Sequence, residues 1–147
     1  MDRRAVKRGH AERWRLAAGI DLPSGRAIRA EVDTGSNVIV LDETLAAEVG
    51  VDLAARSTRT RESTDETGHK VTRYFTTLSG HISVTGATEY RITGPGVMFQ
   101  KIIYDGLIGD QFLRNFATTY DLAGSRVIFA PPEARVSPGV PPGASGA

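Results

Sequence analysis

Apolar and polar residues alternate in the first half of the chain. Over residues 26–32, apolar side chains occupy positions 28, 30 and 32, and charged side chains stand at 29 and 31. A period of two places alternate side chains on one face, so this segment predicts a strand with one buried face. Residues 38–41 are apolar throughout, which is typical of a strand buried on both faces. Further strands are expected over residues 14–20, 71–78, 81–84, 89–93 and 97–99.

A short helix is expected between these strands. Asp42 is a good N-cap, because its carboxylate can accept a hydrogen bond from the first helical turn. Leu45 and Val49 then share one face, and Gly50 stands where a helix commonly ends in the left-handed conformation. The last elements expected are a second short helix over residues 110–116 and a hairpin of residues 118–122 and 126–129.

The two ends of the chain differ from its middle. Residues 131–147 are rich in Pro and Gly, which build neither a ladder nor a core, so we expect a flexible tail there. The folded domain is therefore expected over residues 13–130, preceded by a flexible basic N-terminus over residues 1–12. One domain is typical of a chain of 147 residues.

The charge is concentrated near the N-terminus. Residues 1–16 hold six basic and two acidic residues, a charge of +4, which leaves −3 in the rest because the whole chain carries +1. Such a segment suits a contact with nucleic acid or an acidic membrane, or else it is a solvated terminus. The solvated terminus is favoured, because no aromatic or glycine pattern of an RNA-binding module accompanies the charge. We expect no nucleic-acid partner.

Composition excludes several kinds of site. The chain has no cysteine, which excludes disulfides, a thiol nucleophile and thiolate metal ligands. Its three histidines have no metal-ligand spacing, so we expect neither a metal nor another cofactor. No run of about 18 apolar residues exists, so no membrane span is expected. Without a secretory signal either, the expected location is cytoplasmic.

The candidate chemistry lies where the alternating strand ends. Val32 leads into Asp33-Thr34-Gly35-Ser36. The Asp-Thr-Gly string alone is weak, since chance places it in roughly a few per cent of chains this long. Its surroundings are more specific: a buried strand and a short helix follow it, and Gly106-Leu107-Ile108-Gly109 stands far downstream, before Phe112-Leu113.

With these features the sequence resembles the retropepsin-like aspartic proteases, including their bacterial single-domain members, over residues 14–129. The resemblance rests on residues 33–36, on the helix over residues 45–51 and on Leu107, Ile108 and Gly109. It implies a mostly β fold: a closed, antiparallel, barrel-like subunit with one or two short helices that works as a homodimer. The three residues Leu107, Ile108 and Gly109 would pack behind the catalytic loop. The following Asp110-Gln111 departs from the family pattern, which leaves the role of Asp110 open.

The resemblance assigns catalysis to Asp33. Two carboxylates held close together cannot both ionise cheaply, so they share a proton, and one acts as base while the other acts as acid. The chain has one such motif, so the second Asp33 must come from another subunit across a two-fold axis. Thr34 is expected to form a hydrogen bond across that axis, Gly35 to allow close backbone approach, and Ser36 to donate to the carboxylate.

A flap hairpin is expected between the two motifs. Its polar tip would include Thr67, Gly68 and His69, although an ordinary surface turn would have the same composition. The basic stretch of residues 56–61 suits either the lining of a substrate pocket or, more simply, a solvated loop. The function expected is an aspartic endopeptidase that cuts a peptide or protein substrate. The alternatives are a non-catalytic dimeric peptide-binding module on the same fold, and an unrelated β domain in which Asp33-Thr34-Gly35 is only a turn.

Overall fold

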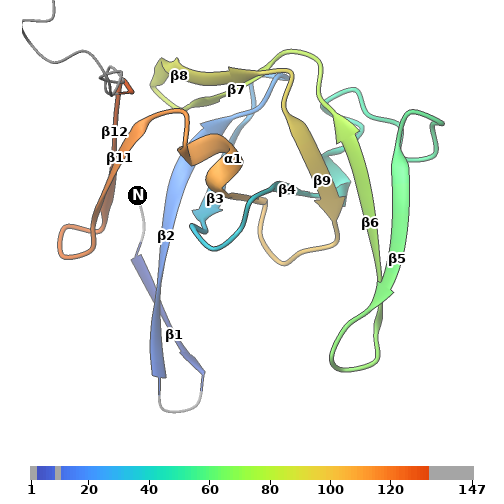
Figure 1. Ribbon diagram of the computed structural model, residues 1–147, viewed down its shortest axis with the longest axis horizontal. Coiled ribbons are helices and arrows are strands. Elements are labelled where there is room, and N and C mark those ends of the chain that lie inside the picture. The colour runs from blue at the N-terminus through green and yellow to red at the C-terminus, as the bar shows by residue number, and fades with distance from the viewer. Residues whose placement is uncertain (1–2, 9–10, 133–147) are drawn as a thin grey trace, which may run out of the picture.

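The structure is a computed structural model of the chain in which residues 3–8 and 11–132 are described, with side chains from Leu16 onward. Strands form most of this part of the chain (Figure 1). The strands are β1 (Arg3–Arg8), β2 (Ala11–Asp21), β3 (Ala27–Val32), β4 (Ile39–Asp42), β5 (Arg59–Thr64), β6 (Lys70–Thr77), β7 (His81–Val84), β8 (Ala87–Thr93), β9 (Gly96–Gln100), β10 (Gly106–Ile108), β11 (Ala117–Asp121) and β12 (Arg126–Ala130). The helices are a 3-10 turn, η1 (Glu43–Leu45), and a single α-helical turn, α1 (Asp110–Leu113).

One large sheet contains most of these strands. Its order is β5-β6-β9-β4-β10-β3-β2-β7-β8, and β1 adds to β2, whereas β11 and β12 pair only with each other. The expectation of a closed barrel is wrong. Closure would require β5 and β8 to pair, but β5 belongs to a hairpin that projects from the body on the side away from β8 (Figure 1). The sheet therefore stays open, and β5 and β8 lie at the two ends of its strand order.

The core confirms the alternation on β3. Ile28 and Ala30 are buried, while Arg29 between them and Ala27 before them are exposed. The largest fully buried side chains come from strands across the sheet, from the residue that follows β6 and from α1: Ile20, Ile39, Leu41, Leu78, Ile82, Phe99, Ile108 and Phe112. Each stabilises the fold by about 1.5–3 kcal/mol relative to an exposed position. This cluster includes Ile108, the neighbour of Val32 in the sheet.

The expected first helix is shorter than its pattern suggested. Asp42 caps it as expected, because its Oδ2 accepts a hydrogen bond from the backbone N–H of Thr44 at 3.3 Å. Only η1 is regular, and turns then carry the chain to Gly50. Gly50 has a φ of +77°, and the N–H of the next residue, Val51, donates to the carbonyl of Ala46 at 2.9 Å. The left-handed glycine therefore ends the segment where the sequence predicted.

Three strands, β1, β5 and β10, lie outside the strand ranges predicted from the sequence. β1 falls within the segment expected to be flexible, and it pairs with β2 from Arg3↔Leu16 to Arg8↔Ala11. β5 contains no apolar residue at all. Ladder hydrogen bonds join backbone groups, so an edge strand can form without the apolar alternation that identifies a buried one. Of the predicted tail, residues 133–147 lie outside the described part of the chain. No helix among the described residues is long and apolar enough to cross a bilayer.

Candidate active site

Asp33 begins an exposed loop at the end of β3. Its backbone N–H donates to the carbonyl of Ile108 at 3.0 Å. Ile108 belongs to β10, which lies parallel to β3 with Ile108 beside Val32. The neighbouring strand therefore fixes the point at which the chain leaves the sheet. Asp33, Thr34 and Gly35 are exposed. Residues 33–37 form the segment called here the Asp33 loop.

Backbone N–H groups of the loop donate hydrogen bonds to Asp33. The N–H of Gly35 donates to Asp33 Oδ1 at 3.0 Å, and the N–H of Ser36 donates to the carbonyl of Asp33 at 3.2 Å. A Cβ on Gly35 would lie 3.3 Å from Asp33 Oδ1, which is tighter than most such contacts. The Ser36 hydroxyl accepts from the N–H of Val38 at 3.4 Å, and no bond from it to Asp33 is present among the described residues. The near contact at Gly35 is with the Asp33 side chain, and the Ser36 hydroxyl bonds along the loop.

A second segment supports the loop from behind. The N–H of Asp110 donates to the carbonyl of Ser36 at 2.7 Å, and the N–H of Gln111 donates to that of Asn37 at 3.2 Å. Gly109 is buried between them. A Cβ there would lie 2.7 Å from the Val38 carbonyl oxygen and would also collide with that of Ser36. Only glycine fits this contact, because two backbones meet at the position where a side chain would begin.

Asp110 has an exposed ionic partner. Its Oδ2 lies 3.7 Å from Arg114 Nε, one helical turn later, and Arg114 also donates to Asn37 Oδ1 at 3.3 Å. Pairs this exposed contribute roughly 0–1 kcal/mol. Asp110 therefore orients Arg114 against the end of the Asp33 loop, a role that its position in the sequence alone left open.

An apolar row crosses the sheet beside the loop. Leu107 lies opposite Val40, Val40 beside Met98, and Met98 opposite Phe75, so the row runs over β10, β4, β9 and β6. Side chains at directly paired positions share one face of a sheet. Val40 is buried, and the other three are half-buried. Leu107, the residue before Ile108, thus begins an apolar floor that extends across β4 and β9 to β6.

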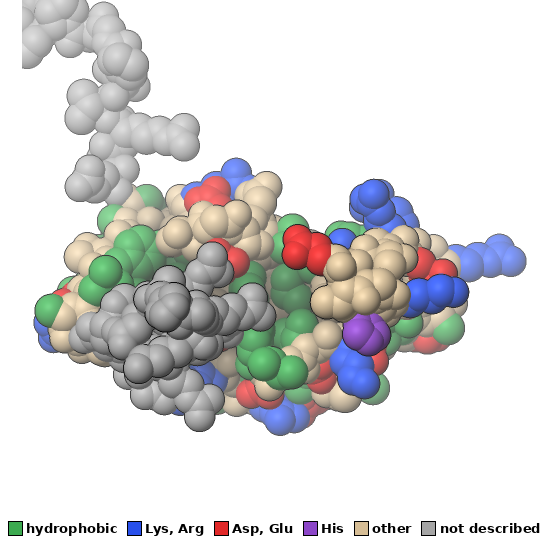
Figure 2. Space-filling model, turned by 90° about the horizontal axis from the view of Figure 1, so that it is seen from below, with side chains coloured by type: hydrophobic (Ala, Val, Ile, Leu, Met, Phe, Trp, Pro, Cys, Tyr) green, Lys and Arg blue, Asp and Glu red, His purple; other side chains and the backbone are tan. Residues whose placement is uncertain are grey.

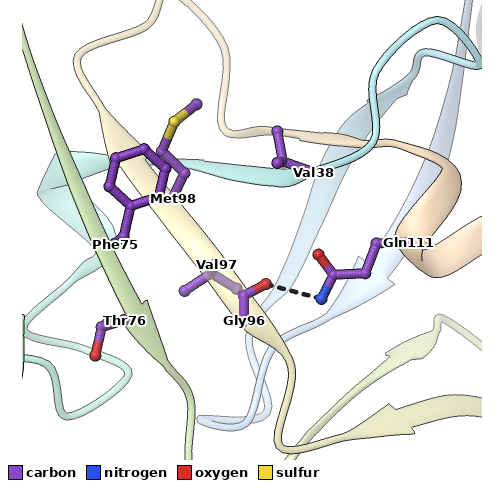
Figure 3. A pocket seen from close by; sticks show the side chains of 7 residues that line it. All are labelled: Val38, Phe75, Thr76, Gly96, Val97, Met98 and Gln111. Carbon is purple, nitrogen blue, oxygen red and sulfur yellow. Dashed lines mark hydrogen bonds between the residues drawn. The ribbon is translucent and has the colours of Figure 1, made fainter. Parts of the chain in front are cut away.

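A pocket of about 190 Å³ opens on this floor (Figure 3). Phe75 and Met98 lie together on one wall of the pocket, and Val38 directly follows the Asp33 loop. Gln111 Nε2 donates to the carbonyl of Gly96 at 3.1 Å and ties α1 to β9. The lining is mainly apolar, with Gln111 and Thr76 as its polar side chains, so it suits an aliphatic or aromatic group.

The sequence assigned no role to the pocket residues. Val38 was read only as part of a buried strand, and neither Phe75 nor Met98 belonged to a motif. They meet because β6, β9 and β4 are adjacent in the sheet. No local pattern encodes that adjacency, and the family resemblance quoted none of these positions.

Comparison with known proteins addresses the fold. A retropepsin-like aspartic protease from Rickettsia conorii has a similar structure, with a TM-score of 0.55 and 20% sequence identity, over 73% of this chain and 84% of the other. The fold is retropepsin-like. The retroviral protease-like domain of Ddi1 from Leishmania major gives a TM-score of 0.48 at 15% identity, over 78% of this chain and 87% of that domain. No protein-family model and no curated protein sequence matches the chain.

In this retropepsin-like fold, the predicted flap tip lies in the turn between β5 and β6. Asp65 Oδ1 accepts hydrogen bonds from the N–H and the hydroxyl of Thr67, at 2.8 and 2.6 Å, and from the N–H of His69 at 2.9 Å. These hydrogen bonds hold the pKa of Asp65 below its ordinary value, and the bond from the Thr67 hydroxyl has the largest effect. Gly68 has a φ of +86°, which the turn requires. Asp65 therefore orders the tip, and its sequence signal was an Asp followed by Thr and Gly in a polar turn.

Among the described residues, no three His, Asp or Glu side chains gather closely enough to hold a metal ion. The polar groups near Asp33 are instead backbone amides and the Asn37–Arg114 contact.

Proposed function

We propose that the chain is one subunit of a homodimeric aspartic endopeptidase, in which Asp33 of each subunit supplies half of the catalytic pair. The observation that carries this proposal is the exposed Asp33 carboxylate on a loop that donates a backbone hydrogen bond to Ile108 and accepts one from Asp110. A fixed loop limits where the carboxylate can go, and one of its oxygens is already bonded by Gly35. The retropepsin-like fold supports the same reading.

The chemistry follows from placing two such carboxylates together. At a separation of a few ångströms the pair retains one proton, because ionising both would bring two negative charges together. The ionised partner takes a proton from a water, and that water attacks the scissile carbonyl carbon. The protonated partner donates to the carbonyl oxygen. The carboxyl group that took the proton from water then donates it to the leaving nitrogen, and the other carboxylate takes back a proton from a hydroxyl of the tetrahedral intermediate. The C–N bond breaks, and the amine and the carboxylic acid are released.

A two-fold dimer would supply the second carboxylate. In such an interface each residue on the axis meets its own copy, so one motif per chain is sufficient. The exposure of Asp33, Thr34 and Gly35 in the single subunit leaves them free to meet a copy. Thr34 would then bond across the axis and hold the two loops in register.

The substrate in this proposal is an extended peptide. The apolar row from Leu107 to Phe75 offers a floor beside Asp33, and the pocket on it can take an apolar side chain. An extended peptide places alternate side chains on one side, so some of them would contact the apolar floor while the others would face the flap.

The test is cleavage of a diverse peptide mixture between about pH 3 and 8, a range that brackets ordinary and raised carboxyl pKa values. Products are identified by mass spectrometry, and the subunit mass by sedimentation velocity. We expect cleavage by a dimer and none by Asp33→Asn, which preserves the volume of the side chain. Full activity in Asp33→Asn would overturn the assignment. Peptide binding without cleavage by the wild type would favour the non-catalytic module.

A further inference from the structure

Three arginines share a face with the pocket. In the β5–β6 ladder Arg59 lies opposite Phe75, and Arg61 lies opposite Arg73. Directly opposite residues share a face, and a step of two along a strand returns to that face. Arg59, Arg61 and Arg73 therefore stand on the side of the hairpin that carries Phe75. Phe75 lines the pocket, so the arginines border it.

These arginines form a positive patch, and no acidic side chain in the described part of the chain is paired with them. Arg59 places its guanidinium 5.1 Å from the centre of the Phe75 ring, and Arg73 Nε donates to Gln100 Oε1 at 3.2 Å. No described acidic side chain forms an ion pair with any of the three. Arg61 and Arg73, as like charges directly opposite, destabilise the ladder. Figure 2 shows Lys and Arg side chains gathered on the right-hand side of the molecule, where β5 and β6 lie.

The nearby acidic groups are placed elsewhere. Glu62 is paired with Thr72 on the opposite face of the hairpin, and Asp65 is engaged by the turn. Asp42 pairs with Gln100, but its carboxylate accepts from the backbone N–H groups of Thr44 and Ile102. A ligand on this face therefore meets three arginines that form no ion pair with a described residue, next to an apolar pocket.

We infer that this face selects peptides carrying an acidic side chain close to the apolar side chain that fills the pocket. The inference rests on the proposed function for the ligand being a peptide. Arg73 and Phe75 are two residues apart on β6, and an extended peptide repeats that spacing between side chains on its own same side. An acidic residue two positions from the apolar one would then lie beside Arg61 and Arg73. Guanidinium groups bind carboxylates through paired hydrogen bonds.

The test uses peptide pairs that differ only in Glu or Gln, with the Glu walked through each position near the apolar residue. We expect the wild type to prefer one Glu peptide by about tenfold in kcat/KM at low salt, and less at high salt. The double variant Arg61→Gln, Arg73→Gln should reduce that ratio towards one. Lys70→Gln is the matched control: Lys70 lies opposite Thr64 on the other face, so the ratio should not change.

A binding assay separates this inference from the proposed catalysis. Fluorescently labelled Glu and Gln peptides are titrated with the inactive Asp33→Asn protein, and the Glu peptide should bind about tenfold more tightly. This result would stand even if no peptide were ever cleaved. Equal affinities for the two peptides, or an equal loss of preference in Lys70→Gln, would overturn the inference. So would tighter binding of a DNA duplex than of any acidic peptide, lost in the double variant.

Discussion

The backbone N–H of Asp33 and the carbonyl of Ile108 are 3.0 Å apart, which ties the two motifs of the sequence into one site. Ile108 is only 1% exposed, so its strand is anchored in the core. Gly109 comes next and lies against the carbonyls of Ser36 and Val38. The position of the candidate catalytic carboxylate is therefore set by the core, through one short strand and one glycine.

Gly109→Ala should destabilise the protein, because its new Cβ would lie 2.7 Å from the Val38 carbonyl oxygen. We expect the free energy of unfolding to fall by about 3 kcal/mol, the upper range for overpacking. Urea denaturation measures this. Gly96→Ala is the control, since the nearest atom to a Cβ there is Gln111 Nε2 at 3.8 Å, an ordinary contact. Equal stabilities of the two variants would show that the Gly109 contact is not tight.

Val38→Phe should narrow the pocket. Val38 lines it across from Phe75 and Met98, so a larger ring would take up room meant for a ligand. We expect kcat/KM for peptides with a large apolar residue at the selected position to fall by about tenfold or more, relative to peptides with Ala there. The comparison of the two peptide classes is its own control, because a general loss of activity would lower both. An unchanged ratio would place the substrate side chain elsewhere.

Thr67→Val should raise the pKa of Asp65 towards its ordinary value of 3.8. The Thr67 hydroxyl bonds to the charged carboxylate, so it lowers the pKa in the folded state. A lowered folded pKa means that the stabilisation of the turn is present above pH 3.8 and is lost as pH falls through the folded pKa. The titration is followed through the carboxyl carbon by NMR. Thr64→Val, one residue outside the turn, should leave the Asp65 pKa where it is.

The sequence predicted the elements that carry apolar side chains on one face. The alternation from residue 26 located β3 and so the start of the Asp33 loop, and Asp42 and Gly50 marked the ends of the first helical segment. It missed β5, which has only polar residues and pairs through its backbone. Barrel closure was predicted wrongly, since closure depends on whether β5 and β8 meet in space, and no local pattern records that.

The candidate site was partly predictable for the same reason. Asp33 and Gly109 stand in short motifs, so the sequence shows them directly. Met98 and Phe75 meet in the pocket only because of the register between β9 and β6, which is a property of the whole sheet. The contact of Arg114 with Asn37 joins residues 77 positions apart in the chain, so it depends on the fold and not on a local spacing. Catalysis, and the second subunit that it requires, remain predictions.

Subunit mixing tests the central claim most directly. Wild-type protein is mixed with Asp33→Asn protein, the subunits are allowed to exchange, and peptide cleavage is followed as the mutant fraction rises at constant total protein. If each active site needs Asp33 from two subunits, an equal mixture should retain about a quarter of the wild-type rate, because only wild-type dimers are active. A rate of about one half, the value for subunits that each act alone with a complete site, would contradict the paired Asp33 mechanism.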